Sequence, residues 1–342
     1  MKRSFLYRII VFCLLLPGIH SDMYSQDLHF SQFYEAPLLR NPSLAGLFEG
    51  DVRVQAVYRN QWSSISVPYQ TGSLNAEYKF PVGKGDDFFT AGLQLLFDRA
   101  GTVALTSTHL LPAINFHKSM SSSRNTYLSL GFMGGLVTRR IDQSRITTNN
   151  QYDGFGYNGS LPTGEVFDNN YSFFDMNVGM SLSTTMGSDE QHLIFGGIAY
   201  HHLNKPVNAF YQNINHLPKW VLSGGLKINA DQMSYVTFFG DYTKQGPYQE
   251  AIAGGLYSRK AGDEDIPNFI IHMGMFYRYK DALIPAVKLD YFPFSFGFTY
   301  DINVSALQTA SNNRGGLETS LSYINYLEND KSSREKLKCP KF

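Results

Sequence analysis

The residues from Phe294 to Ser305 alternate strictly between a large apolar side chain and a small or polar one. Successive side chains of a β-strand point to opposite faces, whereas an α-helix would scatter both sets around its circumference. One face would carry Phe294, Phe296, Phe298, Tyr300, Ile302 and Val304, and the other Ser295, Gly297, Thr299, Asp301, Asn303 and Ser305. The pattern therefore predicts a strand with one apolar and one polar face.

The same alternation recurs from about residue 50 to residue 326, interrupted by Gly-, Pro- and Asn-containing connections. The candidate strands are residues 52–59, 74–80, 89–97, 104–116, 125–138, 170–186, 191–203, 218–229, 233–242, 248–258, 268–280, 283–291, 294–305 and 316–326. This gives about fourteen strands, an even number as single-chain bacterial barrels have. Many of them reach the ~9–11 residues that a tilted strand needs to cross a bilayer.

The repeated pattern predicts an all-β fold, a transmembrane antiparallel β-barrel of about 14 strands, with lipid outside and a polar interior rich in Gly and Ser. A secreted β-sandwich or propeller would also alternate. A propeller would repeat a signature every ~40–50 residues, which the sequence does not show. A sandwich would rarely need so many strands of this length.

The first 25 residues have the pattern of a signal peptide, with basic residues before the apolar run Ile9–Leu16 and a break at Pro17. Beyond them no apolar run approaches the ~18 residues of a spanning helix, and the mean hydropathy is −0.22. We divide the chain into a signal peptide (1–25), an N-terminal periplasmic or plug segment (26–50), an outer-membrane barrel (51–328) and a periplasmic tail (329–342). The protein is thus expected to be exported and integral to the outer membrane.

Charge and cysteine content narrow the function classes further. Charged residues make up 17% of the chain, and the formal net charge is +0, so nothing points to nucleic acid. Cys13 falls in the signal peptide, which leaves Cys339 alone in the mature chain and predicts no internal disulfide. Cys339 is either a plain tail thiol or an attachment point to a neighbour by thioester, disulfide or lipid.

The connections include two long ones. Residues 142–169 contain several Asn and Gly residues, and Asp153-Gly154 within them predicts a turn. Residues 204–217 form the second long connection. In an outer-membrane barrel, long loops are expected on the external side and short turns on the periplasmic side.

The histidines are the first candidates for chemistry. His201 and His202 are adjacent, so on a strand they face opposite ways and cannot bind one metal together. A site with His192, His216 or His272 is conceivable, but no Cys- or carboxylate-rich spacing supports it. Two hydrolase-like pairs can be drawn, His109 with Asp98 and His117 with Ser119, but no nucleophile signature accompanies them. We therefore expect no catalytic residue, no cofactor and no metal.

The motif Arg59-Asn60-Gln61-Trp62 ends the first candidate strand. A Trp there can belong to the aromatic girdle of a membrane barrel. The alternative is a docking surface for a periplasmic partner. Spacing alone leaves both readings open.

Further motifs are spread along the chain. They are Asp27-Leu28-His29-Phe30-Ser31-Gln32-Phe33-Tyr34, Pro37-Leu38, Asn41-Pro42-Ser43-Leu44-Ala45-Gly46, Tyr58-Arg59-Asn60-Gln61-Trp62, Asp98-Arg99-Ala100-Gly101, the stretch from Gly196 to Pro206, Tyr300-Asp301-Ile302-Asn303, Gly315-Gly316-Leu317-Glu318 and the ending Cys339-Pro340-Lys341-Phe342. In combination these motifs resemble the PorP/SprF family of outer-membrane proteins associated with type IX secretion and gliding. The resemblance covers essentially the whole mature chain and is specific only in combination.

The resemblance implies a barrel without enzymatic activity that helps to export and anchor a secreted adhesin carrying a C-terminal sorting domain. It also implies contacts with periplasmic, peptidoglycan-associated secretion components. The residues predicted to contact partners are Phe30, Gln32, Tyr34, Asn41, Pro42, Arg59, Asn60, Gln61, Trp62 and Cys339. The alternative function is an outer-membrane channel for small or hydrophobic solutes, similar to fatty-acid transporters.

Overall fold

The computed structural model describes residues 27–327, apart from residues 64–66, 84, 166–167, 188–191, 211–213, 263–266 and 307. The predicted signal peptide (1–25) and the predicted tail (329–342) lie outside the described residues, as does Cys339. The predictions made for these segments therefore stay predictions.

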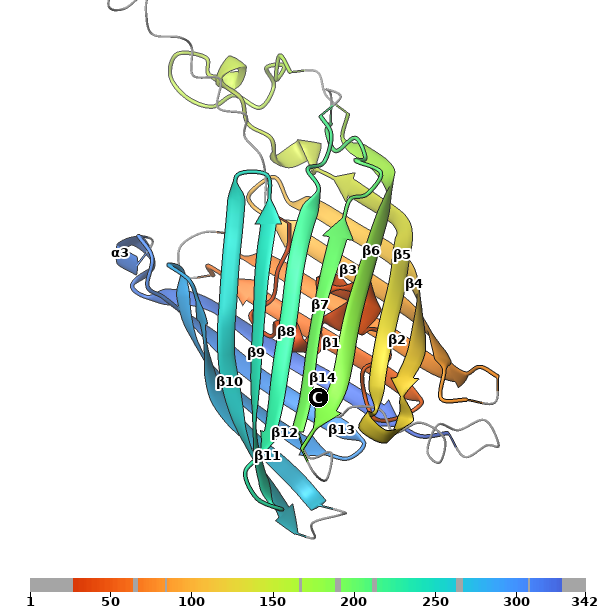
Figure 1. Cartoon of the computed structure of the whole chain (residues 1–342). Helices are drawn as coiled ribbons and strands as arrows, with labels where there is room; N and C mark the ends of the chain where they lie inside the picture. Colours follow the sequence, from red (N-terminus) through yellow and green to blue (C-terminus); the bar gives the residue numbers. More distant parts are fainter. Residues whose placement is uncertain are drawn as a thin grey trace, which may run out of the picture.

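Fourteen antiparallel strands close into one barrel, in which each strand pairs with its neighbours in sequence (Figure 1). The strands are β1 (Val52–Gln61), β2 (Tyr69–Pro81), β3 (Phe88–Ala100), β4 (Leu105–Ser121), β5 (Thr126–Arg140), β6 (Asn170–Met186), β7 (His192–His201), β8 (Lys219–Asn229), β9 (Ser234–Gln245), β10 (Tyr248–Gly262), β11 (Pro267–Arg278), β12 (Ala282–Tyr291), β13 (Phe294–Asn303) and β14 (Arg314–Asn325). The barrel closes between β1 and β14, where Val52 lies opposite Asn325. The predicted fold class is confirmed.

The two faces of each strand differ as the alternation predicts. On β13 the outward side chains of Phe294, Phe296 and Phe298 are exposed, and Phe298 is 54% exposed. The inward side chains of Thr299 and Asp301 are buried. An apolar outer belt around a polar interior is the pattern of a barrel that faces lipid.

The connections differ strongly between the two ends of the barrel. The longest ones, residues 141–169 between β5 and β6 and residues 202–218 between β7 and β8, lie at one end, which we call the long-loop end. At the opposite end β1 begins and β14 ends, and the turns between the strands are short. In single-chain outer-membrane barrels long loops are extracellular and short turns periplasmic.

The helices within residues 27–327, as far as these are described, are single turns. They are η1 (Phe33–Glu35), α2 (Pro37–Arg40), η2 (Pro42–Leu44), η3 (Ser122–Arg124), η4 (Gln143–Arg145), η5 (Asn149–Gln151) and α3 (Gln308–Ser311). Within the described part of the chain, no helix has the length and apolar character needed to cross a membrane.

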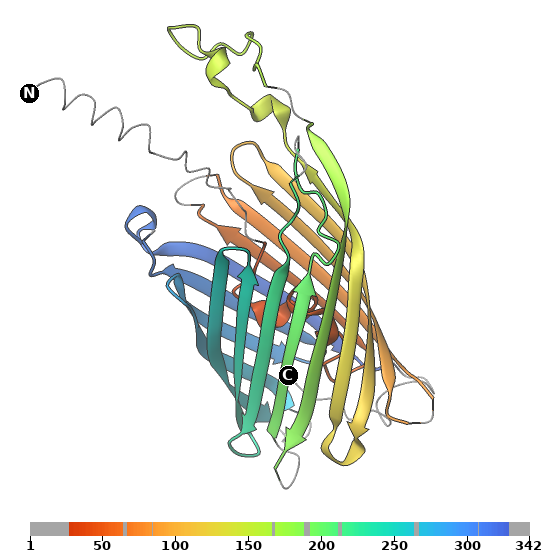
Figure 2. The same ribbon diagram turned by 45° about the horizontal axis from the view of Figure 1, so that its top comes forward.

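Residues 27–51, which we call the plug segment, lie inside the barrel and fill its lumen (Figure 2). The segment starts at the long-loop end, where the Asp27 backbone N–H donates to Oε1 of Gln245 at 2.9 Å. It ends at the opposite end, where the Asp51 N–H donates to the Asn325 carbonyl at 2.9 Å. Its apolar side chains form the interior core with the wall, as Phe33 does with Phe276.

Candidate functional site

The middle of the plug segment rests on glycines of the wall. The turn at Asn41–Ser43 faces Gly131 of β5, Gly179 of β6 and Gly197 of β7. A Cβ on Gly131 would lie 2.5 Å from the Pro42 carbonyl carbon, and one on Gly179 would lie 1.8 Å from Oδ1 of Asn41. Only a hydrogen atom at these wall positions lets the Pro42–Ser43 backbone and the Asn41 side chain approach so closely.

Polar side chains hold this turn in register. The side chain of Asn41 accepts from the Ser43 N–H at 2.9 Å, which caps η2 at its N-terminus. From β4, Nδ2 of Asn115 donates to the Ser43 carbonyl at 2.7 Å and to the Ala45 carbonyl at 2.8 Å. Buried backbone groups of a non-repetitive segment are thereby satisfied by the wall.

A buried carboxylate of β14 binds the start of the plug segment. The Ser31 N–H donates to Oε1 of Glu318 at 2.7 Å, and the Gln32 N–H donates to Oε2 at 2.8 Å. Nε of Arg59 lies 3.2 Å from Oε1 of Glu318, and the Glu318 side chain is fully buried. A second carboxylate, Asp301 of β13, joins this group, which we call the ionic cluster.

Asp301 connects two arginines to the plug segment. Its Oδ2 lies 3.1 Å from Nη2 of Arg59 and 3.0 Å from Nη2 of Arg278. Its Oδ1 accepts from the Ser31 hydroxyl at 2.6 Å. Two buried guanidinium groups are thus balanced by two buried carboxylates, the condition under which buried charges are tolerated.

Further ion pairs join the plug segment to other sides of the wall. Arg40 donates through Nε to Asp241 of β9 at 2.6 Å. Glu35 pairs with Nζ of Lys288 on β12 at 2.7 Å. The segment is therefore held by complementary charges on several strands, not by apolar packing alone.

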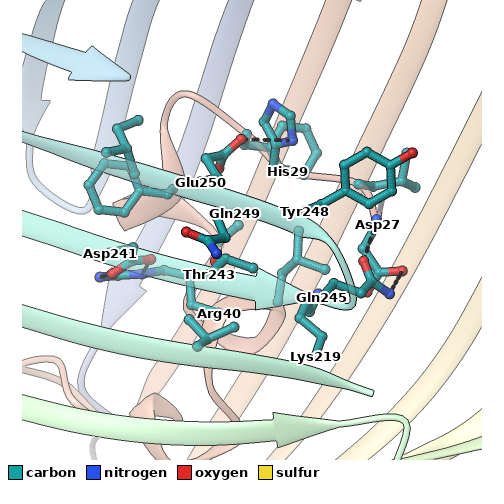
Figure 3. A pocket seen from close by; sticks show the side chains of 17 residues that line it. Asp27, His29, Arg40, Lys219, Asp241, Thr243, Gln245, Tyr248, Gln249 and Glu250 are labelled. Atoms are coloured by element: carbon teal, nitrogen blue, oxygen red, sulfur yellow. Dashed lines mark hydrogen bonds and ion pairs between the residues drawn. The ribbon is translucent and has the colours of Figure 1, made fainter. Parts of the chain in front are cut away.

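The plug segment begins in a cluster of charged groups at the long-loop end (Figure 3). Oδ2 of Asp27 lies 2.7 Å from Nζ of Lys219 and 2.7 Å from Nε2 of His202, and Oδ1 lies 3.1 Å from Nε2 of His216. Oδ1 of Asp175 lies 2.9 Å from Nδ1 of His202. We call these five residues the mouth cluster.

The geometry of the mouth cluster favours an ion-pair latch over a metal centre. Asp27, His202 and His216 offer ligand atoms close enough for one cation. The ammonium of Lys219 already occupies one face of that carboxylate, however. The two imidazole rings stack at 3.8 Å with an interplanar angle of 26°, so they lie side by side instead of splaying around a central ion. The prediction that His201 and His202 face opposite ways on a strand is wrong, because β7 ends at His201 and both side chains are buried in the interior. His201 bonds to Asn177 and to the Arg40 carbonyl, while His202 joins Asp27 and Asp175.

The protonation of His202 makes the latch depend on pH. Burial opposes the charged form, but the carboxylates of Asp27 and Asp175 outweigh burial and raise the pKa of His202 to about 9. The pKa of His202 is therefore higher in the folded protein than the ~6.5 of an unfolded chain. The protonated side chain stabilises the fold fully below pH ~6.5, and this stabilisation is lost as the pH rises through the pKa of the folded protein.

We expect the folded barrel to lose stability between about pH 6.5 and pH 9, by ~1.4 kcal/mol per pH unit from this one group. Substitution His202→Gln should remove that slope, because glutamine does not titrate. Urea unfolding of the protein refolded in lipid vesicles, followed at several pH values, measures both slopes. Equal slopes for the two proteins would contradict the assignment.

A small cavity separates the start of the plug segment from strands β8 to β10 (Figure 3). Its lining includes polar side chains such as His29, whose Nδ1 lies 3.4 Å from Oε2 of Glu250. Apolar side chains such as Phe30 and Ile252 complete the lining. At about 70 Å³ it has room for a few water molecules.

The residues predicted for partner contact divide by location. Phe30, Gln32, Asn41 and Arg59 are buried in the contact between plug segment and wall, as is Pro42. Tyr34 stacks between two wall rings, at 5.4 Å from Phe239 and 5.2 Å from Phe276. In this arrangement these side chains contact their own barrel, so a role toward a partner stays a prediction.

The remaining predicted residues lie at or beyond the rim. Asn60 and Gln61 are half-buried at the end of β1. Trp62 follows at the long-loop end, where its ring meets the edge of Tyr69 at 5.0 Å. This end is opposite to the one where β1 begins, so a partner docked on Trp62 would face the exterior if the long loops do.

The hydrolase-like pairs are not formed. Nε2 of His109 lies 2.9 Å from Oγ of Ser107, and Asp98 accepts instead from Thr71 at 2.7 Å. His117 is buried, and its Nδ1 lies 2.7 Å from Oγ of Ser129 on the neighbouring strand. Both histidines take part in hydrogen bonds with serines of the barrel wall.

From the sequence, Arg59 is named as a contact residue, and Asp301 and Glu318 are parts of the family resemblance, but the sequence does not predict that these charged wall residues hold the plug segment. The alternation does indicate that Asp301 points into the barrel, because Asp301 belongs to the polar face of the strand Phe294–Ser305. Its partners Arg59 and Arg278 lie on other strands, and alternation alone does not tell which inward side chains of different strands meet in the lumen.

The architecture is that of a membrane-type β-barrel closed by its own N-terminal segment. The family described as Type IX secretion system membrane protein PorP/SprF matches residues 22–323. The chain belongs to this family, and the predicted resemblance is confirmed. A search of curated proteins finds no match.

Solved structures with a similar outline are remote. The Ralstonia pickettii toluene transporter TbuX is 9% identical, with a TM-score of 0.48 over 84% of this chain and 92% of that one. The CymD monoaromatic hydrocarbon channel is 11% identical, with a TM-score of 0.47 over 84% and 92%. CdiB from Acinetobacter baumannii is 10% identical, with a TM-score of 0.44 over 80% of this chain, which spans 60% of CdiB.

Proposed function

We propose that the protein is a non-enzymatic outer-membrane platform of type IX secretion or gliding, which helps to export and anchor a secreted adhesin with a C-terminal sorting domain. Its partners outside would be that adhesin, and on the periplasmic side peptidoglycan-associated secretion components. Family membership supports the secretion role. The mechanism would be steric and adhesive, because a barrel fixed in lipid holds whatever its loops bind.

The observation that carries the proposal is the filled lumen. The plug segment is held by Glu318 and Asp301 at one level and by Asp241 and Lys288 at others. Buried, mutually paired charges resist displacement, since removing one partner typically costs ~3–5 kcal/mol. A barrel built in this way is suited to binding at its two ends rather than to conduction through its centre.

Deleting the gene should leave at least one adhesin with a C-terminal sorting domain unsecreted or shed into the medium. Mass spectrometry of peptides released from intact cells by protease compares the mutant with the parent strain. Reintroducing the gene should restore the surface adhesin. Normal surface retention of every such adhesin in the deletion strain would contradict the proposal.

The alternative of a solute channel makes a different prediction. Wild-type protein reconstituted in liposomes would then pass small or hydrophobic solutes selectively and with a measurable affinity. With the plug segment in place, we expect flux no greater than in protein-free liposomes.

A further inference from the structure

The loop between β5 and β6 carries a small hairpin at its tip, far from the barrel wall (Figure 1). Tyr152 and Tyr157 pair across it as an isolated antiparallel bridge. Asp153 closes the turn, because its Oδ1 accepts from the N–H groups of Phe155 and Gly156, both at 3.0 Å. The turn predicted at Asp153-Gly154 is present.

Hydrogen bonds below the hairpin hold its base. Gln151 is buried in the loop, accepts from the Asn158 N–H at 2.7 Å and donates to the Leu161 carbonyl at 3.2 Å. The Thr148 hydroxyl donates to the Thr163 carbonyl at 2.7 Å. The hairpin is therefore ordered before it meets anything else, which lowers the entropic cost of binding.

The ordered hairpin presents three aromatic rings to solvent. Phe155 is 100% exposed, and Tyr152 and Tyr157 are each 61% exposed. They lie at the long-loop end, away from the apolar belt on the strands (Figure 2). A cluster of exposed aromatic side chains on an ordered support is typical of an interaction site.

The composition of residues 148–160 favours a protein partner over a lipid surface. The sequence Thr-Asn-Asn-Gln-Tyr-Asp-Gly-Phe-Gly-Tyr-Asn-Gly-Ser is rich in Tyr, Asn, Gly and Ser, the residues enriched in antibody loops that recognise proteins. It contains no Lys or Arg, which anionic lipid headgroups would attract. Its one charge, Asp153, is bound within the turn.

We propose that this hairpin is the extracellular contact through which the barrel holds its exported protein partner, with Phe155 entering an apolar pocket of that partner. The proposal rests on the proposed function, and it names the surface of the barrel that the adhesin binds. Tyr152 and Tyr157 flank the inserted ring and supply contact area and hydroxyl groups at its rim.

Substitution Phe155→Ala should lower the amount of surface-retained adhesin about tenfold or more, as expected for an aromatic side chain at the centre of an interface. The matched control is Tyr279→Ala, because Tyr279 is also 61% exposed and lies at the long-loop end, in the turn between β11 and β12. Both variants should reach parental barrel levels and show the same heat-dependent mobility on gels.

A photoreactive phenylalanine analogue placed at position 155 in intact cells identifies the neighbour. A crosslink to an exported protein with a C-terminal sorting domain, together with the loss in Phe155→Ala, supports the proposal. Crosslinking to lipopolysaccharide alone, or adhesin retention equal to that of Tyr279→Ala, overturns it. If the deletion strain also retains every adhesin, the proposed function fails; if only Phe155→Ala does, the hairpin assignment fails alone.

Discussion

Substitution Glu318→Ala is expected to release the plug segment from the lumen. The change leaves the N–H groups of Ser31 and Gln32 without their acceptor and leaves Arg59 without one of its two carboxylates. Breaking a buried pair in this way costs ~3–5 kcal/mol. That is enough to shift a segment held by local contacts toward an open state, while the hydrogen bonds between strands stay in place.

Ion conductance across planar lipid bilayers gives one measure of release, and it should rise from near background in the wild type. Tryptic cleavage after Arg40 gives a second, because Arg40 is buried in the lumen and becomes accessible only when the segment leaves. The control is Lys118→Ala, which removes an exposed pair with Asp87 and should cost less than ~1 kcal/mol. Wild-type conductance and protection in Glu318→Ala would contradict the role of the ionic cluster.

Substitution Gly131→Val is expected to displace the same segment by steric means. The new Cβ would lie 2.5 Å from the backbone of both Pro42 and Ser43, so backbone atoms must move and no flexible side chain can absorb the contact. We expect a destabilisation of ~3 kcal/mol or more, at the upper end for added volume in a packed interior.

The matched control is Gly196→Val. Gly196 lies on β7 beside Gly197, but a Cβ there would meet nothing within 4 Å. Urea midpoints in vesicles, together with tryptic cleavage after Arg40, compare the two variants. The assignment of Gly131 as a seat for the plug segment is refuted if both variants behave like the wild type.

The two variants test different parts of one arrangement. Glu318 holds the start of the plug segment through its charge, and Gly131 leaves space for the middle of the segment because it has no side chain.

Much of the barrel was predictable because the alternation of apolar and polar residues depends only on neighbouring positions in the sequence. The alternation from Phe294 to Asn303 reports which side chain faces outward, since the strand period is two whatever the neighbouring strand is. The closed order of strands followed from their even number and the short turns between most of them.

The interior was less predictable. Pro37 and Pro42 marked residues 26–50 as non-strand, which left both a periplasmic and a plug location open. The ion pairs of Asp301 with Arg59 and Arg278 join residues more than twenty positions apart, and such pairs leave no periodic trace. Glycines such as Gly179 were predicted only as part of a polar interior rich in Gly and Ser.

The sequence by itself determined that the chain forms outward-apolar strands and that it carries the residues of its family, because both depend on the order of neighbouring side chains. Only the tertiary structure decided that the lumen is filled, that Asp27 meets His202 and His216, and that Glu318 binds the plug backbone. The physical reason is that these contacts depend on which strands face the segment across the closed barrel, and barrel closure places residues together that no local pattern relates.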